Sequence, residues 1–334
     1  MVCSLILLDD IVKKRTDSQK PRNEGVTYVI ERYPSANSEL WELAASYVDG
    51  VKMQGAIPLL SSESSLVKKI KFYHQFDVKV STGSAVSEYA IIENSFERLV
   101  KEAAKIGFDI IEVGENIVDF SLEKKKKIKQ IVESQELEIQ WKVGKRDPRH
   151  QLSIEDTIKK IEENISLGAK KVILEANQGL GVGIYDENGL IKWGSVASLT
   201  NKYPPSTFVF EAPQEFQQFS LIAEFGERVN MSEVDLESVL SVESERRGIM
   251  AKSAFGNANL REDPEGGPAT KFIYYIIKTK NPIEQSEIIN LSHLPRRTVQ
   301  NSIDELKNQG LIVERTSLND ARKRVYYPIR SEWL

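Results

Sequence analysis

Residues 170–175 read Lys-Lys-Val-Ile-Leu-Glu, a short apolar run that ends in a glutamate. Residues 109–113 (Asp-Ile-Ile-Glu-Val) and 207–211 (Thr-Phe-Val-Phe-Glu) share this character. Short runs rich in β-branched and aromatic residues predict buried β-strands. The sequence therefore predicts eight strands, because five further runs of this kind occupy residues 26–31, 48–53, 77–82, 138–143 and 228–231.

Amphipathic stretches separate these runs, for example residues 88–106, 122–134 and 154–167, with apolar side chains near helical spacing. Consecutive strand ends lie 20 to 36 residues apart, which suits one strand–helix unit each. Eight such units close a (β/α)8 TIM barrel. The alternative, a doubly wound open sheet, needs a glycine-rich turn after the first strand, where this chain has Glu31-Arg32-Tyr33-Pro34.

The composition is that of a soluble globular protein, and the length favours two domains over one. The chain has 334 residues, 40% of them hydrophobic and 28% charged, with a net charge of −4. Its single cysteine, Cys3, excludes an intramolecular disulfide and a Cys-rich zinc site. The apolar run near the start falls far short of the ~20 residues that a membrane span needs. We therefore expect a cytoplasmic protein with no membrane partner.

The C-terminal part has a different charge from the rest. Residues 268–334 contain 11 Lys+Arg and 7 Asp+Glu, a net of +4, whereas the remainder has a net of −8. Glycines and prolines at the junction of these two parts are typical of a linker. We predict a barrel domain over residues 1–250, a linker over 251–268 and a small domain over 269–334.

The small domain reads as three helices, 270–278, 285–291 and 295–309, followed by two β-rich runs, 311–315 and 324–327. This order predicts a winged helix-turn-helix that resembles MarR-type domains, including the exit Leu306, Gly310, Leu311 and Ile312. A recognition helix places its first turns against base edges, and wing cations contact phosphates. We expect double-stranded DNA as a partner, with protein contacts as the alternative. The candidate DNA-binding residues are Arg296, Arg297, Thr298 and Gln300 on the helix and Arg315, Arg322, Lys323 and Arg324 beside the wing.

Polar side chains stand at the ends of most predicted barrel strands. Buried without partners, each charge would cost several kcal/mol, and the active site of a TIM barrel lies where its strands end. We expect these side chains to converge there; the alternative is that they form pairs on the solvent side. They are Glu31, Lys52, Glu112, Lys142, Glu175, Glu211 and Asn230.

Several motifs, in their order over residues 5–250, together resemble the phosphosulfolactate synthase family. The resemblance implies a Mg²⁺-dependent addition of sulfite to phosphoenolpyruvate, an early step towards coenzyme M. The motifs are Lys20-Pro21-Arg22-x-x-Gly25-x-Thr27, Asp49-x-x-Lys52, Ile111-Glu112-Val113, Leu174-Glu175-Ala176, Gly183-Ile184-Tyr185-Asp186, Phe210-Glu211-Ala212-Pro213 and Glu243-x-x-Arg246-x-Gly248.

The chemistry of this reaction suggests roles for the matching residues. Charge develops on the substrate carboxylate, which calls for a divalent cation and fixed positive groups. Mg²⁺ takes oxygen ligands, so Glu112, Glu175 and Glu211 are the candidate ligands, and Lys52 is the candidate general acid. The catalytic set is thus Lys52, Glu112 and Glu175. The expected contacts to a small anionic substrate come from Arg22, Lys142, Glu211 and Asn230.

The chain departs from the family pattern after its sixth strand. The family's Ala-Arg-Glu-Ser-Gly becomes Ala176-Asn177-Gln178-Gly179-Leu180, and an amide cannot reproduce the bidentate anion binding of an arginine. A second interpretation is therefore a transcription regulator whose barrel senses a small anionic metabolite. Because winged-helix proteins often read two-fold sites, we also expect a homo-oligomer.

Overall fold

The computed structural model describes residues 15, 19–32, 38–249, 264–317 and 323–328. By its contacts the chain divides into two compact units, one of residues 15–243 and one that contains residues 244–334. Each unit is described by itself.

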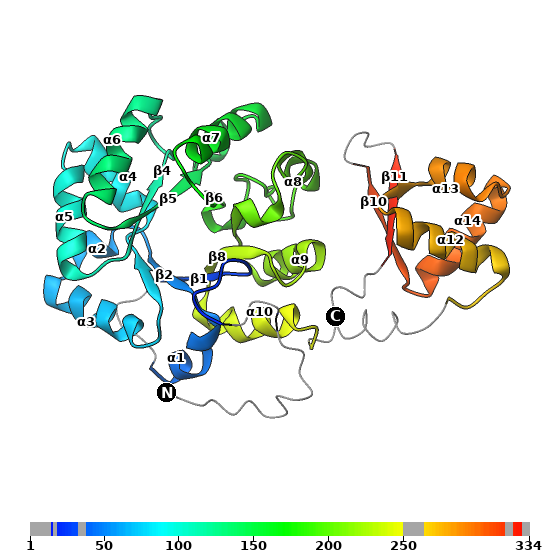
Figure 1. Ribbon diagram of the computed structural model, residues 1–334, viewed down its shortest axis with the longest axis horizontal. Coiled ribbons are helices and arrows are strands. Elements are labelled where there is room, and N and C mark those ends of the chain that lie inside the picture. The colour runs from blue at the N-terminus through cyan, green and yellow to red at the C-terminus, as the bar shows by residue number, and fades with distance from the viewer. Residues whose placement is uncertain (1–14, 16–18, 33–37, 250–263, 318–322, 329–334) are drawn as a thin grey trace. The chain divides into compact units, whose positions relative to one another are not determined.

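The first unit is a closed barrel of eight parallel strands in the order β1 to β8, with β8 paired to β1 (Figure 1). The predicted TIM barrel is confirmed, and the open sheet was the wrong alternative. The strands are β1 (Thr27–Glu31), β2 (Gly50–Met53), β3 (Lys79–Ser81), β4 (Ile110–Gly114), β5 (Glu138–Val143), β6 (Val172–Leu174), β7 (Phe208–Glu211) and β8 (Asn230–Val234).

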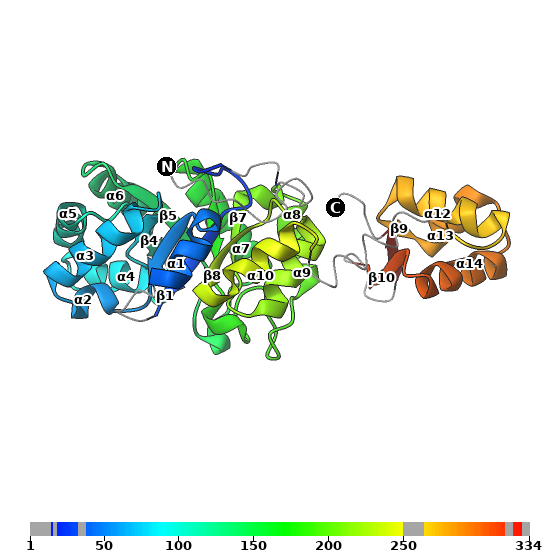
Figure 2. The same ribbon diagram turned by 90° about the horizontal axis from the view of Figure 1, so that it is seen from below.

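Helices cover the outside of the barrel (Figure 2). Side-chain caps begin some of them: Ser153 accepts a hydrogen bond from the Asp156 backbone N–H at 3.0 Å, so α7 begins where a capping residue predicts it. The helices are α1 (Ser38–Ala44), α2 (Ile57–Leu60), α3 (Glu63–His74), α4 (Ser84–Ile92), α5 (Phe96–Ile106), α6 (Leu122–Glu133), α7 (Ile154–Ser166), α8 (Trp193–Thr200), α9 (Glu215–Phe225) and α10 (Val239–Arg246).

The main hydrophobic core lies between the barrel and these helices. Val51 and Met53 of β2 belong to it, as do Ile111 and Val113 of β4. Successive strand side chains point to opposite faces. Lys52 and Glu112, which stand between those core residues, therefore face the inside of the barrel.

Two predicted elements differ from the structure. The expected helix over residues 88–106 is two helices, α4 and α5, because the chain turns at Asn94, whose φ is +52°; asparagine tolerates this left-handed conformation better than most residues. The last strand runs to Val234 rather than to residue 231, which brings Glu233 into it.

Within residues 264–317 and 323–328, the second unit has three helices and a small antiparallel sheet of strand order β10-β11-β9 (Figure 1). Its own core contains Ile273, Ile277, Ile288, Val299 and Leu306. Residues 250–263 of the predicted linker lie outside the described residues. The elements are α12 (Pro268–Lys280), β9 (Ile283–Glu284), α13 (Gln285–Ser292), α14 (Arg296–Asn308), β10 (Ile312–Thr316) and β11 (Arg324–Pro328).

Candidate active site

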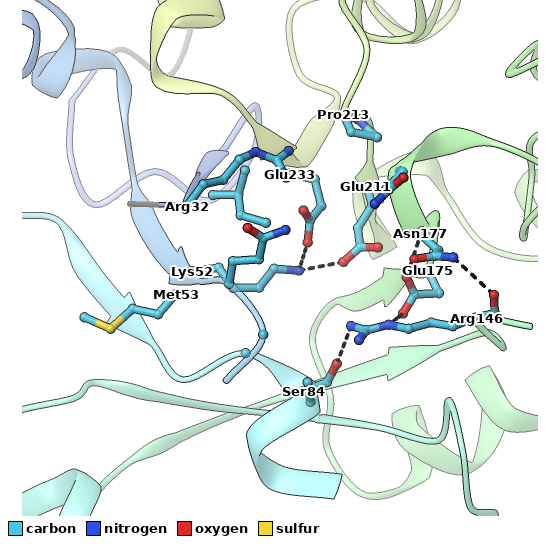
Figure 3. A pocket seen from close by; sticks show the side chains of 16 residues that line it. Arg32, Lys52, Met53, Ser84, Arg146, Glu175, Asn177, Glu211, Pro213 and Glu233 are labelled. Carbon is cyan, nitrogen blue, oxygen red and sulfur yellow. Dashed lines mark hydrogen bonds and ion pairs between the residues drawn. The ribbon is translucent and has the colours of Figure 1, made fainter. Parts of the chain in front are cut away.

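A pocket of about 140 Å³ lies at the carboxyl ends of the barrel strands (Figure 3). Side chains from β2, β7 and β8 and from the loops after β3, β5 and β6 reach into it. This is the end of the barrel where TIM-barrel enzymes place their chemistry. The charged side chains that line the pocket are Arg32, Lys52, Arg146, Glu175, Glu211 and Glu233.

Lys52 stands among three carboxylates. Its Nζ lies 2.7 Å from Glu211 Oε1 and 3.6 Å from Glu112 Oε2, and it also pairs with Glu233. Its side chain is 7% exposed. Burial would lower the pKa of this lysine, but the charges of the three glutamates outweigh burial and raise the pKa well above its usual value. Lys52 is therefore a protonated ammonium at neutral pH.

Lys142 is a second buried ammonium beside the first. Its Nζ lies 2.6 Å from Glu175 Oε2, 2.7 Å from Glu211 Oε1 and 3.8 Å from Glu112 Oε1. A single carboxylate oxygen, Glu211 Oε1, thus bridges Lys52 and Lys142. Burial would raise the pKa of Glu211, yet the two ammonium groups hold it well below its usual range. Glu211 is ionised and fixed, since its other oxygen accepts a bond from the Ala176 N–H at 2.9 Å.

Glu233 differs from Glu211 although it contacts the same lysine. Its burial and the nearby charge of Glu211 raise its pKa, and the attraction of Lys52 only partly offsets this. Its φ of +60° marks an irregular position near the end of β8. Sequence reasoning missed Glu233 because the predicted strand ended at residue 231.

Arg146 is a second residue that sequence reasoning missed. It follows β5, and its Nε lies 3.2 Å from Glu175 Oε2 while its guanidinium reaches Ser84 Oγ at 3.5 Å (Figure 3). Its side chain is 39% exposed, so it stays open to a ligand. The run Lys145-Arg146-Asp147 directly after a predicted strand was the available signal.

The first turn of α4 also lines the pocket, through Gly83, Ser84 and Ala85. Gly83 has a φ of +76°, and a Cβ there would lie 2.7 Å from the Met53 carbonyl oxygen. Only glycine allows this approach of α4 to β2. The positive end of the α4 dipole consequently faces the pocket.

The structure does not bring every predicted residue to this end. Arg22 precedes β1 and binds Asp49 Oδ1 at 3.0 Å. Asn230 begins β8 and donates to the Phe208 carbonyl oxygen at 3.0 Å. Both lie at the amino ends of the strands because Arg22 precedes its strand and Asn230 is the first residue of its own. The order of motifs along a chain does not say which end of a strand a residue occupies.

Glu31 is also absent from the site, because it faces outward. Its carboxylate binds Lys69 Nζ at 3.1 Å and Tyr73. The seven expected strand-end residues therefore separate into two groups. Those that converge are Lys52, Glu112, Lys142, Glu175 and Glu211.

The glutamates expected to bind Mg²⁺ are already engaged by the protein's own cations and N–H groups. Glu112 Oε1 accepts from the Ser84 N–H at 3.1 Å, and Glu175 Oε1 from the Asn177 N–H at 2.8 Å. Their other oxygens contact Lys52 and Lys142. Across the described ranges, no group of three or more His, Cys, Asp or Glu side chains is arranged to hold a metal ion. As the residues lie, they do not fit a Mg²⁺ held directly between the three glutamates.

The predicted recognition helix is α14, and its first turn is open. Arg296 and Arg297 are exposed, and Thr298 is partly buried. Gln300 is engaged within the unit: its Oε1 accepts from Gln285 Nε2 at 2.6 Å.

The candidate wing residues make contacts inside the unit. Arg315 lies over the Tyr327 ring at 5.3 Å. Lys323 pairs with Glu284 at 2.9 Å and Arg324 with Glu314 at 3.4 Å. Arg322 lies outside the described residues.

No helix in the described part of the chain is both long and apolar enough to cross a bilayer.

Comparisons with known proteins match the barrel unit of this chain to one family. The sequence model of the family described as (2R)-phospho-3-sulfolactate synthase (ComA) matches residues 15–252. Phosphosulfolactate synthase from Methanothermobacter thermautotrophicus is 30% identical over 249 residues, 73% of this chain and 96% of that protein. The enzyme of the same name from Methanocaldococcus jannaschii is 30% identical over 230 residues, 67% and 92% of the two chains. The family match ends before α12 begins at Pro268.

Proposed function

Because the chain belongs to the (2R)-phospho-3-sulfolactate synthase family, we propose that its barrel adds sulfite to phosphoenolpyruvate. The observation that carries this proposal is the position of Lys52, a buried ammonium that lines the pocket and is held protonated by Glu112, Glu211 and Glu233. The reaction needs a proton donor beside developing negative charge, and Lys52 supplies both a proton and a positive charge.

The reaction has two steps. The sulfur of sulfite attacks the methylene carbon of phosphoenolpyruvate, so that a C–S bond forms while the double-bond electrons move through C2 onto the carboxylate. The product of this step is an enediolate. Lys52 Nζ then gives its proton to C2, which completes 2-phospho-3-sulfolactate, and the lysine regains a proton from solvent. Lys142, fixed 2.7 Å from the same Glu211 oxygen, stabilises the enediolate electrostatically.

Two positively charged features of the pocket can bind the anionic groups of the substrates. Arg146 offers guanidinium N–H groups suited to phosphate or sulfite oxygens, and the first turn of α4 presents its positive end at Gly83 and Ser84. Asn177 holds the Arg146 backbone by donating to its carbonyl oxygen at 3.2 Å. In this proposal Arg146 replaces Arg22 as the anion-binding arginine.

Charge balance favours an additional cation during turnover. The four carboxylates of the site, Glu112, Glu175, Glu211 and Glu233, are balanced by four cations, Arg32, Lys52, Lys142 and Arg146. Both substrates are anions, so their binding adds uncompensated negative charge. Magnesium usually binds through one or two carboxylates together with substrate phosphate. The Mg²⁺ requirement stays a prediction. The three-glutamate ligand set does not fit, so no step above depends on the ion.

The test of this proposal is product formation. The purified protein is incubated with Mg²⁺, sulfite and phosphoenolpyruvate and followed by phosphorus NMR. We expect the phosphoenolpyruvate signal to be replaced by that of one phosphate ester, only when sulfite is present. An unchanged phosphoenolpyruvate signal from folded protein would refute it.

For the C-terminal unit we propose a winged-helix domain, beginning near residue 269 after a linker over residues 251–268, that binds double-stranded DNA as a homo-oligomer. The order α12, β9, α13, α14, β10, β11 supports the fold. The exposed Arg296 and Arg297 at the start of α14 support the contact.

DNA binding is tested by fluorescence anisotropy with duplex DNA at several salt concentrations. We expect the double variant Arg296→Ala/Arg297→Ala to bind more weakly, by about 1–3 kcal/mol for each lost base contact. The matched control is Lys278→Ala/Lys280→Ala on α12. Equal binding by all three proteins would contradict the assignment of α14.

A second function for the barrel, sensing a small anion to control DNA affinity, is favoured by one observation. Asn177 and Gln178 line the pocket where the family pattern has an arginine and a glutamate. The anisotropy experiment tests this idea when phosphoenolpyruvate or sulfite is added: a shifted DNA affinity without turnover supports the sensor.

A further inference from the structure

A second cavity, of about 770 Å³, lies at the amino ends of the barrel strands, opposite the pocket described above. Residues that precede or begin β1, β2, β3, β5 and β6 line it. Its volume falls in the range of ligand-binding pockets, about 300–1,000 Å³. We propose that this cavity is a binding site for a small polyanion whose clustered oxygens contact Lys171, Lys20 and the Tyr28 hydroxyl. This inference is independent of the reaction proposed for the opposite end.

The lining of the cavity carries an excess of positive charge. Its acidic side chains are Asp49, Asp77, Glu133 and Glu138, and its basic ones are Lys20, Arg22, Lys79, Lys129, Lys170 and Lys171. Three of the carboxylates already have cationic partners inside the protein: Asp49 binds Arg22, Glu133 binds Lys129 and Glu138 binds Lys79. These pairs leave three cations, Lys20, Lys170 and Lys171, against one remaining carboxylate, Asp77.

Lys171 combines partial burial with a lack of close partners for its ammonium. It is partly buried just before β6, and its ammonium makes no hydrogen bond or ion pair with any residue that the structure describes. Burial lowers its pKa more than Glu24 and Glu138 raise it. An anion in the cavity would supply the partner that this ammonium lacks.

Lys20 is held in place by backbone groups rather than by a carboxylate. Its Nζ donates to the carbonyl oxygens of Ala45 at 2.6 Å and Phe76 at 2.9 Å. Burial lowers its pKa to about 8, so it still carries a proton at neutral pH. An ammonium has three N–H donors, and the third is open to a ligand.

Tyr28 and Gln140 form a polar floor inside the barrel at this end. Gln140 Nε2 donates to Tyr28 Oη at 3.1 Å. The phenolic proton and the Gln140 amide oxygen have no hydrogen-bond partner among the described residues, although both side chains are only partly buried and line the cavity. Gly50 makes room for the Tyr28 ring, since a Cβ at that position would lie 2.4 Å from it. The floor can therefore both donate to and accept from a bound molecule.

The test is isothermal titration calorimetry at low salt with two probes, inorganic pyrophosphate and citrate, which separate phosphate from carboxylate chemistry. The proteins are the unaltered chain, Lys171→Met, Tyr28→Phe and Arg146→Met, each checked for folding by circular dichroism. Tyr28→Phe keeps the ring over Gly50 and removes only the hydroxyl. Arg146→Met removes a cation from the opposite pocket and is the matched control.

We expect at least one probe to bind the unaltered chain, and the binding at this cavity to persist in Arg146→Met, which alters only the opposite pocket. Binding should weaken roughly tenfold in Lys171→Met, because a charge-assisted hydrogen bond is lost. It should weaken several-fold in Tyr28→Phe, because the lost hydrogen bond is neutral. The probe that binds identifies the ligand chemistry. Absence of binding by both probes would overturn the proposal. So would undiminished binding by Lys171→Met and Tyr28→Phe, or a loss confined to Arg146→Met.

Discussion

Lys52 Nζ and Glu211 Oε1 lie 2.7 Å apart in the buried mouth of the barrel, although 159 residues separate them in the sequence. The same oxygen binds Lys142 at 2.7 Å. One carboxylate thus holds two ammonium groups in place, and the properties of the site depend on it.

Glu211 and Glu233 contact the same lysine, but replacing each by neutral glutamine should have opposite effects on the free energy of unfolding. Glu211→Gln leaves two ammonium groups without their shared partner, and breaking a buried pair in this way costs about 3 kcal/mol of the free energy of unfolding. Glu233→Gln should cost little or be stabilising, because the fold raises the pKa of Glu233 and so disfavours its charge. Urea unfolding at pH 7 measures both. Equal losses would contradict the asymmetry.

Stability should also fall in acid because of Glu211. Its pKa is lowered by folding from 4.5, so its contribution is fully present above pH 4.5 and is lost as the pH falls through the lower, folded value. The free-energy difference between the unaltered chain and Glu211→Gln should therefore shrink below pH 4.5. Unfolding curves between pH 3 and pH 7 test this, and a constant difference would contradict it.

The ion pairs of Lys52 should limit the stability of the fold at high pH. Its folded pKa lies above 10.5, so its ion pairs stabilise the fold fully below that pH and are lost as the pH rises through the higher, folded value. Lys52→Met should remove part of the alkaline loss of stability. Thermal unfolding above pH 10 is the measurement, and an unchanged alkaline profile in the variant would speak against the assignment.

Arg146→Lys should weaken substrate binding with little effect on folding. The change keeps the charge but removes the guanidinium fork, so we expect KM for phosphoenolpyruvate or sulfite to rise about tenfold. The matched control is Arg149→Lys in the same loop, whose side chain is 82% exposed and pairs only with Asp147 among the described residues. Steady-state kinetics of the three proteins measure these KM values. A similar KM in all three would contradict the proposal that Arg146 binds substrate.

Magnesium should matter for turnover but not for the folded protein alone. We expect EDTA to abolish activity, whereas Mg²⁺ without substrate should leave Tm unchanged, because the glutamate oxygens already contact N–H and ammonium groups. A ligand that binds only the folded state raises Tm. A clear rise with Mg²⁺ alone would show that the glutamates rearrange into a metal site.

Much of the barrel was predictable because its signal is periodic. Eight apolar runs at regular spacing predicted eight strands, and the polar side chains at their ends predicted that Lys52 and Glu112 lie together. Glu233 was not predictable in this way, since residues 231–234 read Met-Ser-Glu-Val and Glu233 has a left-handed backbone. Arg146 lies in a loop, whose path periodicity does not predict, and Arg22 and Asn230 belong to the other end of the barrel.

The most direct test of the role of Lys52 uses two variants, Lys52→Met and Lys125→Met. For each, the turnover of phosphoenolpyruvate is measured in the presence of sulfite. Lys125 is an equally buried lysine, 2.7 Å from Glu115 and outside the pocket, so it controls for the stability lost with a buried ion pair. We predict that Lys52→Met loses at least a hundredfold in kcat, as removal of a general acid does, while folded Lys125→Met keeps its activity. Comparable turnover by both variants would contradict the central role of Lys52.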